Sequence, residues 1–221
     1  MKKAFSFLVL LVLLVLSAFV CLDAFAVDTA AIDRVREGVD RSPVIRARFE
    51  QTKTIRSLKR PLVVSGRLVF SQRHGVLWAI ERPYRITYVL GEDRVAEIDD
   101  AGTRRERASS ELPGFSQVSR VFRALLSAKT QVLGEYFDVR VKTSAEREGT
   151  APWELVLTPK QDHLAQFMSG MRVSGARFVE NLSIDEAGGN RSEIRFFDTR
   201  GDGALSGDER ALFGDLSPEK P

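Results

Sequence analysis

Cysteine is almost absent from this chain of 221 residues, and histidine is scarce. The single cysteine, Cys21, lies in the first segment, and the two histidines, His74 and His163, belong to unrelated parts of the chain. Intramolecular disulfides are therefore excluded, and a zinc or copper site built from thiolates and imidazoles is poorly supported. No G-x-S-x-G elbow is present, and the carboxylates are scattered without a distinct acid–base pair. We expect a protein that is not an enzyme.

A strong excess of one charge is also absent. The chain has 33 Lys and Arg against 30 Asp and Glu, which gives a formal net charge of +3. So small an imbalance does not indicate nucleic-acid binding. No dinucleotide fingerprint stands in a strand–turn–helix context, and we expect neither a cofactor nor a metal.

The first segment has the pattern of a secretory signal. Met1-Lys2-Lys3 precedes an apolar run from Ala4 to Val20, and Ala24-Phe25-Ala26 supplies a small-x-small end. We expect a signal peptide over 1–26 and a single domain over 27–221, stabilised by its core alone in the bacterial periplasm. The alternatives are an uncleaved membrane anchor and a lipid on Cys21, although Val20 stands where lipid processing needs a small residue.

Alternation with period two predicts strands through most of the remaining chain. We expect several strands between Val44 and Glu111, then strands at 137–142, 153–159, 171–185 and 192–198. The strand over 171–185 should carry a bulge near Gly175, because the apolar parity shifts there. Helical spacing predicts helices at 28–41, 116–127, 163–169 and 207–213. Short turns favour antiparallel pairing, and a long meander with one apolar face curls. The predicted fold class is α+β: an incomplete antiparallel β-barrel of about ten or eleven strands, covered by two to three helices.

The stretch DTRGDGALSGDE, residues 198–209, nearly matches a calcium-binding loop. Arg200 occupies the third ligand position, however, and the residues before Asp198 alternate as a strand where a calcium hand needs a helix. Ser206 and Glu209 have the spacing of a capping box that opens a helix. We interpret the stretch as a turn and a helix cap, with weak calcium binding as the alternative.

Several segments together resemble a known family. They are RARFEQTKT (46–54), GRLVFSQRHGVLWAIERP (66–83) and WELVLTPK (153–160), and in order and spacing they look like the periplasmic outer-membrane lipoprotein carriers of the LolA type. The closing segment 195–213 is similar to a LolA-like branch of that family. The resemblance implies a half-barrel closed by helices, acylated cargo, an inner-membrane lipoprotein-release transporter and an outer-membrane acceptor. We also expect a monomer.

The resemblance also implies site residues. Arg73 matches the arginine that latches the helical lid, after a one-residue gap and with His74 where a proline is usual. The acyl cavity would be lined from the strands by Phe49, Leu68, Phe70, Trp78, Ile80 and Tyr88, and from the lid by Phe122, Leu125, Leu126, Phe167 and Met168. Ordinary core packing is the alternative for each of them. The alternative function is a regulatory or sensor module that detects lipoproteins or glycolipids with a similar half-barrel.

Overall fold

A computed structural model describes residues 33, 35, 37–108, 111, 115–126, 130–143 and 152–214. The predicted signal segment and half of the first predicted helix, 28–41, lie outside these residues, and the signal segment stays a prediction. In the described half of that helix, residues 33, 35, 37 and 38 are helical, whereas 39–41 are not. Val35 and Val39, from that helix segment, are described and are buried. No helix in the described ranges is long and apolar enough to cross a membrane.

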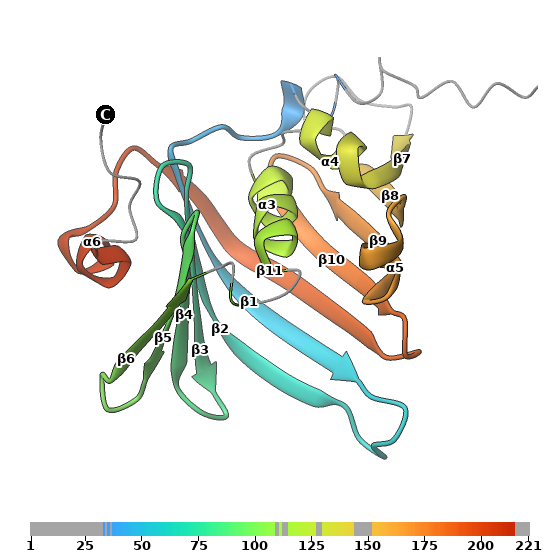
Figure 1. The fold of residues 1–221 in the computed structure, drawn as a ribbon. Coiled ribbons are helices and arrows are strands. Elements are labelled where there is room, and N and C mark those ends of the chain that lie inside the picture. The colour runs from blue at the N-terminus through green and yellow to red at the C-terminus, as the bar shows by residue number, and fades with distance from the viewer. Residues whose placement is uncertain are drawn as a thin grey trace, which may run out of the picture.

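A single antiparallel sheet forms most of the molecule (Figure 1). Its eleven strands lie in the order β6-β5-β4-β3-β2-β1-β11-β10-β9-β8-β7. Their bounds are β1 Val44–Thr54, β2 Leu62–Ser71, β3 Gly75–Arg82, β4 Ile86–Leu90, β5 Arg94–Asp99, β6 Arg104–Ala108, β7 Phe137–Thr143, β8 Trp153–Pro159, β9 Met168–Gly175, β10 Val179–Glu186 and β11 Arg191–Asp202.

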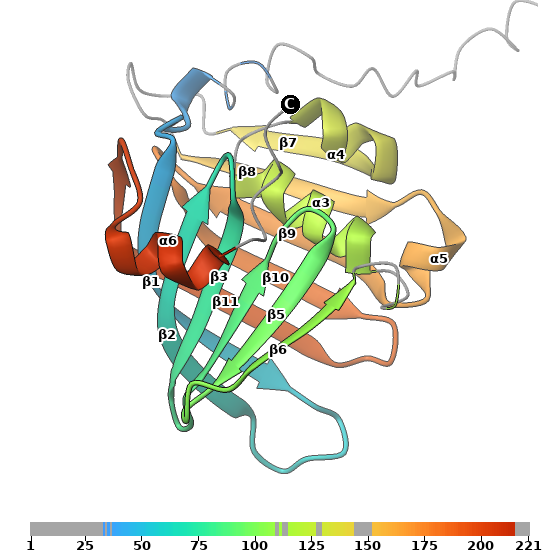
Figure 2. The same ribbon diagram turned by 60° about the vertical axis from the view of Figure 1, so that its left-hand side comes forward.

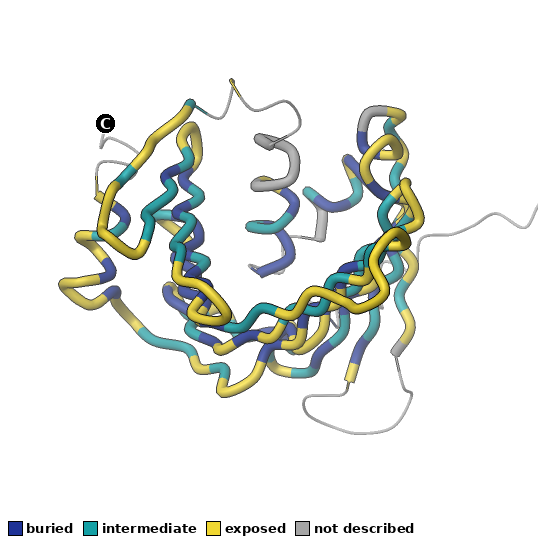
Figure 3. The backbone as a smooth tube through the Cα atoms, turned by 90° about the horizontal axis from the view of Figure 1, so that it is seen from below, coloured by how far each residue is buried: buried dark blue, intermediate teal, exposed yellow. Residues whose placement is uncertain are grey.

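The sheet is strongly curved but stays open. Strands β1 and β11, from opposite ends of the chain, pair at its centre from Val44↔Asp202 to Thr54↔Arg191, while β6 and β7 form its two edges. Figure 3 shows the resulting trough from below, with a helix between its two walls. The predicted class, an incomplete antiparallel barrel with covering helices, is confirmed.

The helices cover opposite faces of this sheet. Helix α3 (Phe115–Leu126) lies inside the trough, with α4 (Thr130–Tyr136) and the short α5 (Asp162–Ala165) beside the β7–β9 wall (Figure 1). Helix α6 (Gly207–Phe213) lies on the outer side, against the first strands (Figure 2). The sheet is therefore flanked by helices on both faces.

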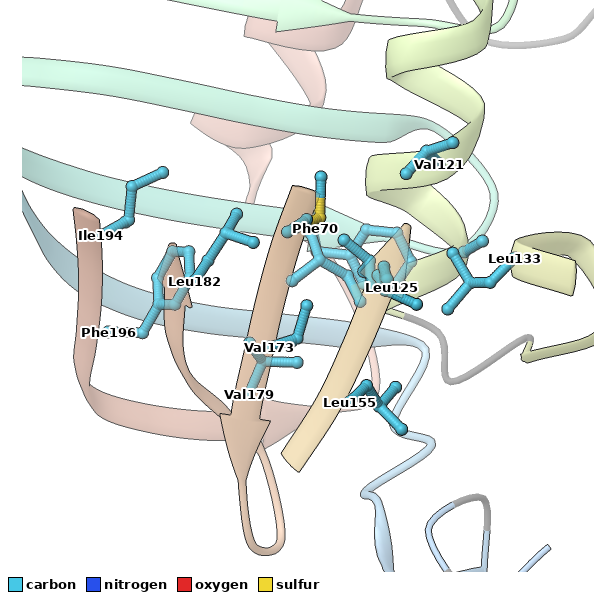
Figure 4. Packing of buried hydrophobic residues seen from close by; sticks show 14 of the residues in the cluster. Phe70, Val121, Leu125, Leu133, Leu155, Val173, Val179, Leu182, Ile194 and Phe196 are labelled. Carbon is cyan, nitrogen blue, oxygen red and sulfur yellow. The ribbon is translucent and has the colours of Figure 1, made fainter. Parts of the chain in front are cut away.

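Two apolar cores follow from the alternation of side chains along each strand. On β2, Leu68 and Phe70 belong to the inner core under α3, whereas Val69 belongs to the outer core with Phe213 of α6. Figure 4 shows the inner core, where residues from α3, α4 and strands β8 to β11 meet. Its labelled members include Val121, Leu125, Leu133, Leu155, Val173, Leu182, Ile194 and Phe196.

Close backbone contact explains one glycine of β2. A Cβ atom on Gly66 would lie 1.9 Å from the carbonyl oxygen of Ala79 on β3. The register between these strands also shifts between Ser65 and Gly66. Only a residue without a side chain allows the two backbones to approach so closely at this point.

Several predicted elements need correction. The strand predicted over 171–185 is two strands, β9 and β10, joined by a tight turn in which the Ala176 N–H donates to the Phe178 carbonyl over 3.2 Å. The parity shift near Gly175 therefore marks a turn between two strands, and the β9–β10 register also shifts beside it, between Val179 and Asn181 opposite Gly175. The helix predicted over 163–169 ends at Ala165, and Met168 begins β9. Helix α4 was not predicted, and β11 extends to Asp202, beyond the predicted end at 198.

Candidate functional site

A cavity of about 440 Å³ opens on the inner face of strands β3 to β6. Two rows of paired residues form its wall. Trp78 pairs with Tyr88, which pairs with Glu97, which pairs with Arg105. In the neighbouring row Leu90 pairs with Val95, and Val95 with Arg107. Since paired residues of antiparallel strands share a face, the register brings all seven side chains to one surface.

Aromatic rings connect this cavity to the helix in the trough. The ring of Trp78 lies 3.9 Å from that of Phe49 on β1 and 6.2 Å from that of Phe196 on β11, measured between centroids. The rings of Trp78 and of Phe122 from α3 meet in an edge-to-face arrangement, with 5.9 Å between centroids. Trp78 is therefore shared between the cavity wall, the sheet core and the helix that covers it.

Helix α3 lies inside the trough and packs against the inner face of the sheet (Figure 1). Its buried residues Val121, Ala124, Leu125 and Leu126 recur at helical spacing and form one apolar stripe toward the sheet. The guanidinium of Arg120 donates to the hydroxyl of Tyr136 over 3.0 Å, which ties α3 to α4. Displacement of α3 would expose the apolar interior of the trough.

The far end of the cavity is polar. Arg105 lies 3.6 Å from the carboxylate of Glu97 and 3.8 Å from that of Asp99, and both contacts are solvent-accessible. Burial raises the pKa of the Tyr88 phenol, and the neighbouring Glu97 and Tyr84 raise it further. The phenol is therefore neutral at physiological pH and keeps its O–H donor. The site has an apolar floor at Trp78 and Leu90 and a charged rim on β5 and β6.

The predicted lining residues fall into three groups. Seven of them, Phe49, Leu68, Phe70, Ile80, Leu125, Leu126 and Met168, are buried in the inner core. Trp78 and Tyr88 line the cavity, and Phe122 packs against the same core from α3. Phe167 is different, because it follows the end of α5, 51% of its surface is exposed, and it is not among the residues of this cavity. Its assignment to the lid stays a prediction.

Sequence analysis missed five of the cavity residues, namely Leu90, Val95, Glu97, Arg105 and Arg107. A signal for them was present. Once Tyr88 is taken as inward-facing, the alternation on β4 and the β5–β6 hairpin place these five on the same face. Three of the five, Glu97, Arg105 and Arg107, are charged, which is not the residue type that an acyl-binding surface predicts.

Arg73 makes no latch contact with the residues that the structure describes. It stands exposed in the turn between β2 and β3, and within the described part of the chain it has no hydrogen bond or ion pair. That turn lies on the outer side, where the ring of His74 is 5.6 Å from that of Phe213 on α6. The latch role stays a prediction drawn from the resemblance.

The stretch 198–209 is organised by an arginine of β1. The Nε of Arg46 donates to Glu209 over 2.7 Å, and its other nitrogens bind Glu209, Asp202 and the Ala204 carbonyl. The hydroxyl of Ser206 accepts from the Glu209 N–H while the Glu209 carboxylate accepts from the Ser206 N–H, so the predicted capping box is present. Two carboxylates of the calcium-like pattern are therefore held by a cation of the protein. Arg200 is an exposed residue of β11 and not of a turn.

Solved structures with a similar outline have little sequence in common with this chain. A LolA superfamily protein from Nitrosomonas europaea is 7% identical, covers 83% of this chain and 96% of its own, and has a TM-score of 0.45. A putative outer membrane lipoprotein-sorting protein domain from Vibrio parahaemolyticus is 10% identical, with 82% and 96% covered and a TM-score of 0.44. A DUF1329 family protein from Desulfovibrio piger is 15% identical, with 84% and 96% covered and a TM-score of 0.44.

No curated protein matches the chain. The family comparison is decisive, because the model described as "Outer membrane lipoprotein carrier protein LolA-like" matches residues 24–191, which is most of the sequence. The chain belongs to the family of outer membrane lipoprotein carrier proteins that are LolA-like.

Proposed function

We propose that this protein is a non-enzymatic periplasmic carrier that shields the acyl chains of a lipoprotein, or of another acylated molecule, and delivers them toward the outer membrane. The observation that carries the proposal is the cavity at Trp78, whose apolar floor continues under the lid helix through Phe122. An inner-membrane release transporter and an outer-membrane acceptor would be its partners, and it would act as a monomer.

The size of the cavity fits an apolar ligand. Its volume of about 440 Å³ falls within the roughly 300–1,000 Å³ of sites for small molecules. Each methylene removed from water contributes about 0.8 kcal/mol, so one acyl chain gains a large favourable free energy there. A cargo with several chains needs more room, and α3 would have to move away from the sheet to provide it.

Release requires that this movement be easy. The lid meets the sheet through the apolar stripe of α3 and the ring of Phe122, and apolar packing has little directional preference. Cargo chains can therefore replace lid side chains with a modest net change in free energy. This exchange is what a carrier needs in order to bind its cargo and then release it.

Tryptophan fluorescence offers a direct test, because the chain has only two tryptophans. Trp78 lines the cavity, whereas Trp153 is buried on β8 and donates to the Ala176 carbonyl over 2.7 Å. In a Trp153→Phe variant, a fatty acid brominated along its chain should quench Trp78 in a saturable way. The matched Trp78→Phe variant, which reports only from Trp153, should show weaker quenching.

Native mass spectrometry of the protein purified from the periplasm would identify the cargo. Acylated molecules released on denaturation would support the proposal. Absence of saturable quenching in both variants, together with a protein that carries no lipid, would refute it.

A further inference from the structure

Exposed apolar side chains gather at one end of the sheet. Among the described residues the large ones are Leu58 (47% exposed), Leu62 (50%), Val63 (50%), Tyr84 (55%), Phe167 and Phe197. Four of them lie in two neighbouring segments: residues 56–63, which comprise the loop after β1 and the start of β2, and residues 82–85, which run from the end of β3 to the start of β4. We call these two segments the basic–apolar tip. Large apolar side chains that are exposed close to one another mark a candidate site of interaction.

The strand register places the two segments side by side. Ser65 pairs with Arg82, so the chain before Ser65 and the chain after Arg82 leave the sheet at the same end. Leu62 and Val63 are consecutive and point to opposite faces of β2, yet both are half exposed. The hairpin therefore projects beyond its neighbours, as the long β1–β2 loop in Figure 1 shows.

Hydrogen bonds of backbone N–H groups connect the β1–β2 hairpin, the β10–β11 turn and Phe167 at this end of the molecule. The Arg56 N–H donates to the side chain of Asn190 over 3.1 Å, which fixes the hairpin to the β10–β11 turn. The Ala187 N–H of that turn donates to the Phe167 carbonyl over 3.0 Å. Phe167, which is absent from the apolar interior, thus lies beside the β10–β11 turn, to which the hairpin is bound.

The charge of the tip is of one sign. Arg56, Lys59, Arg60, Arg82 and Arg85 are all exposed, and neither 54–66 nor 82–85 contains an acidic residue. In the part of the chain that the structure describes, none of these five side chains has a carboxylate partner. Cations elsewhere on the sheet do have partners, for example Arg67 with Glu81 and Arg195 with Glu50.

We propose that the basic–apolar tip binds the surface of a membrane that contains anionic lipids. Leucine, valine and tyrosine side chains at the ends of hairpins can enter the interface between headgroups and acyl chains, while flanking cations bind the phosphates. The apolar residues stand on projecting tips instead of forming one flat surface, which favours a lipid surface over an acidic protein partner. This inference goes beyond cargo binding, because the tip is separate from the cavity residues.

Sedimentation with lipid vesicles tests the proposal. The purified protein should bind vesicles that contain phosphatidylglycerol, bind weakly to vesicles of phosphatidylcholine alone, and lose affinity as salt is raised. Each cation near an anionic surface contributes about 1 kcal/mol, or a factor of about five, so Lys59→Gln with Arg60→Gln should lower the partition coefficient about 25-fold. Leu58→Ser with Leu62→Ser should also weaken binding, and it should do so with little dependence on salt.

Matched controls come from β11. Arg195→Gln with Arg200→Gln removes the same charge from an exposed strand, and Phe197→Ser removes an exposed apolar side chain. Both controls should bind vesicles nearly as well as the unmodified chain. Absence of vesicle binding, or equal losses in control and tip variants, would overturn the proposal. Quenching of Trp78 by a soluble brominated fatty acid is measured without vesicles, so failure of membrane binding and failure of cargo binding are distinguishable.

Discussion

The substitution Glu209→Gln tests the contact that fastens the terminal helix to the sheet. Glu209 is 8% exposed and accepts hydrogen bonds from both Arg46 and its own capping partner Ser206. Glutamine has nearly the same shape but carries no charge, and it has only one oxygen to accept hydrogen bonds. The variant therefore removes the ion pair and part of the cap while it leaves the packing of Phe213 in place.

The loss of stability can be worked out from these contacts. A hydrogen bond to a charged group contributes roughly 1.5–3 kcal/mol, and the helix cap about 1 kcal/mol. Glutamine retains part of both, and Arg46 keeps Asp202 and the Ala204 carbonyl as partners. We therefore expect a loss of about 2 kcal/mol, or a fall in Tm of roughly 4–8 °C for a chain of this size.

Urea unfolding at pH 7 measures this difference, with Glu50→Gln as the control. Glu50 lies 3.9 Å from Arg195 in an exposed pair, so its replacement should cost less than about 1 kcal/mol. Equal losses in the two variants would refute the view that Arg46 and Glu209 hold α6 in place.

The effect should also depend on pH. The hydrogen bonds from Arg46 lower the pKa of Glu209 below its ordinary value of 4.5, against the opposing effect of burial. A lowered carboxyl pKa stabilises the folded state above the ordinary value, and this contribution is lost as pH falls through the lowered pKa. The difference between the unmodified protein and Glu209→Gln should therefore shrink in acid, and a difference that grows there would contradict this sign.

Three further outcomes follow from the structure. Gly66→Ala should lower the free energy of unfolding in urea by about 1–3 kcal/mol or more, because the new Cβ meets the Ala79 carbonyl. The control Gly203→Ala has nothing within 4 Å of the new Cβ and should be nearly neutral, so equal losses would contradict the close approach. Phe122→Ala removes an aromatic contact with Trp78 that contributes about 0.5–1.5 kcal/mol. The variant should therefore release a fatty-acid probe about two- to tenfold faster, and an unchanged release rate would count against a lid role for α3. Calcium should leave Tm unchanged, because Arg46 holds Asp202 and Glu209; a rise reversed by a chelator would favour the calcium alternative.

Arg73→Leu separates the resemblance from the observed conformation. The exposed side chain has no partner in the described structure, so its loss should change stability by less than about 0.5 kcal/mol. Unchanged release of the fatty-acid probe would identify Arg73 as a surface residue. Altered release would support the latch, formed in a different position of the lid.

Local patterns in the sequence determined most elements of this fold. Alternation placed most of the strands, because most of them have one face in a core, and the Ser206/Glu209 spacing placed the terminal helix. The errors lie where one local pattern has two explanations. A change of parity between Val173 and Phe178 fits a bulge within one long strand as well as a tight turn between two strands, and only the pairing of β9 with β10 shows that a turn lies there, with a register shift beside it.

The tertiary structure alone decided which residues meet across long sequence distances. Nothing in the sequence indicates that Arg46 binds Glu209, which is 163 residues away. The carboxylates of the calcium-like pattern therefore have no partner that the sequence alone can identify. The cavity likewise depends on strand register, which brings Trp78 beside Tyr88 and sets Arg105 and Arg107 on its rim. Periodicity is a property of each segment by itself, whereas a cavity or an ion pair between distant residues exists only after the strands have paired and the sheet has curved.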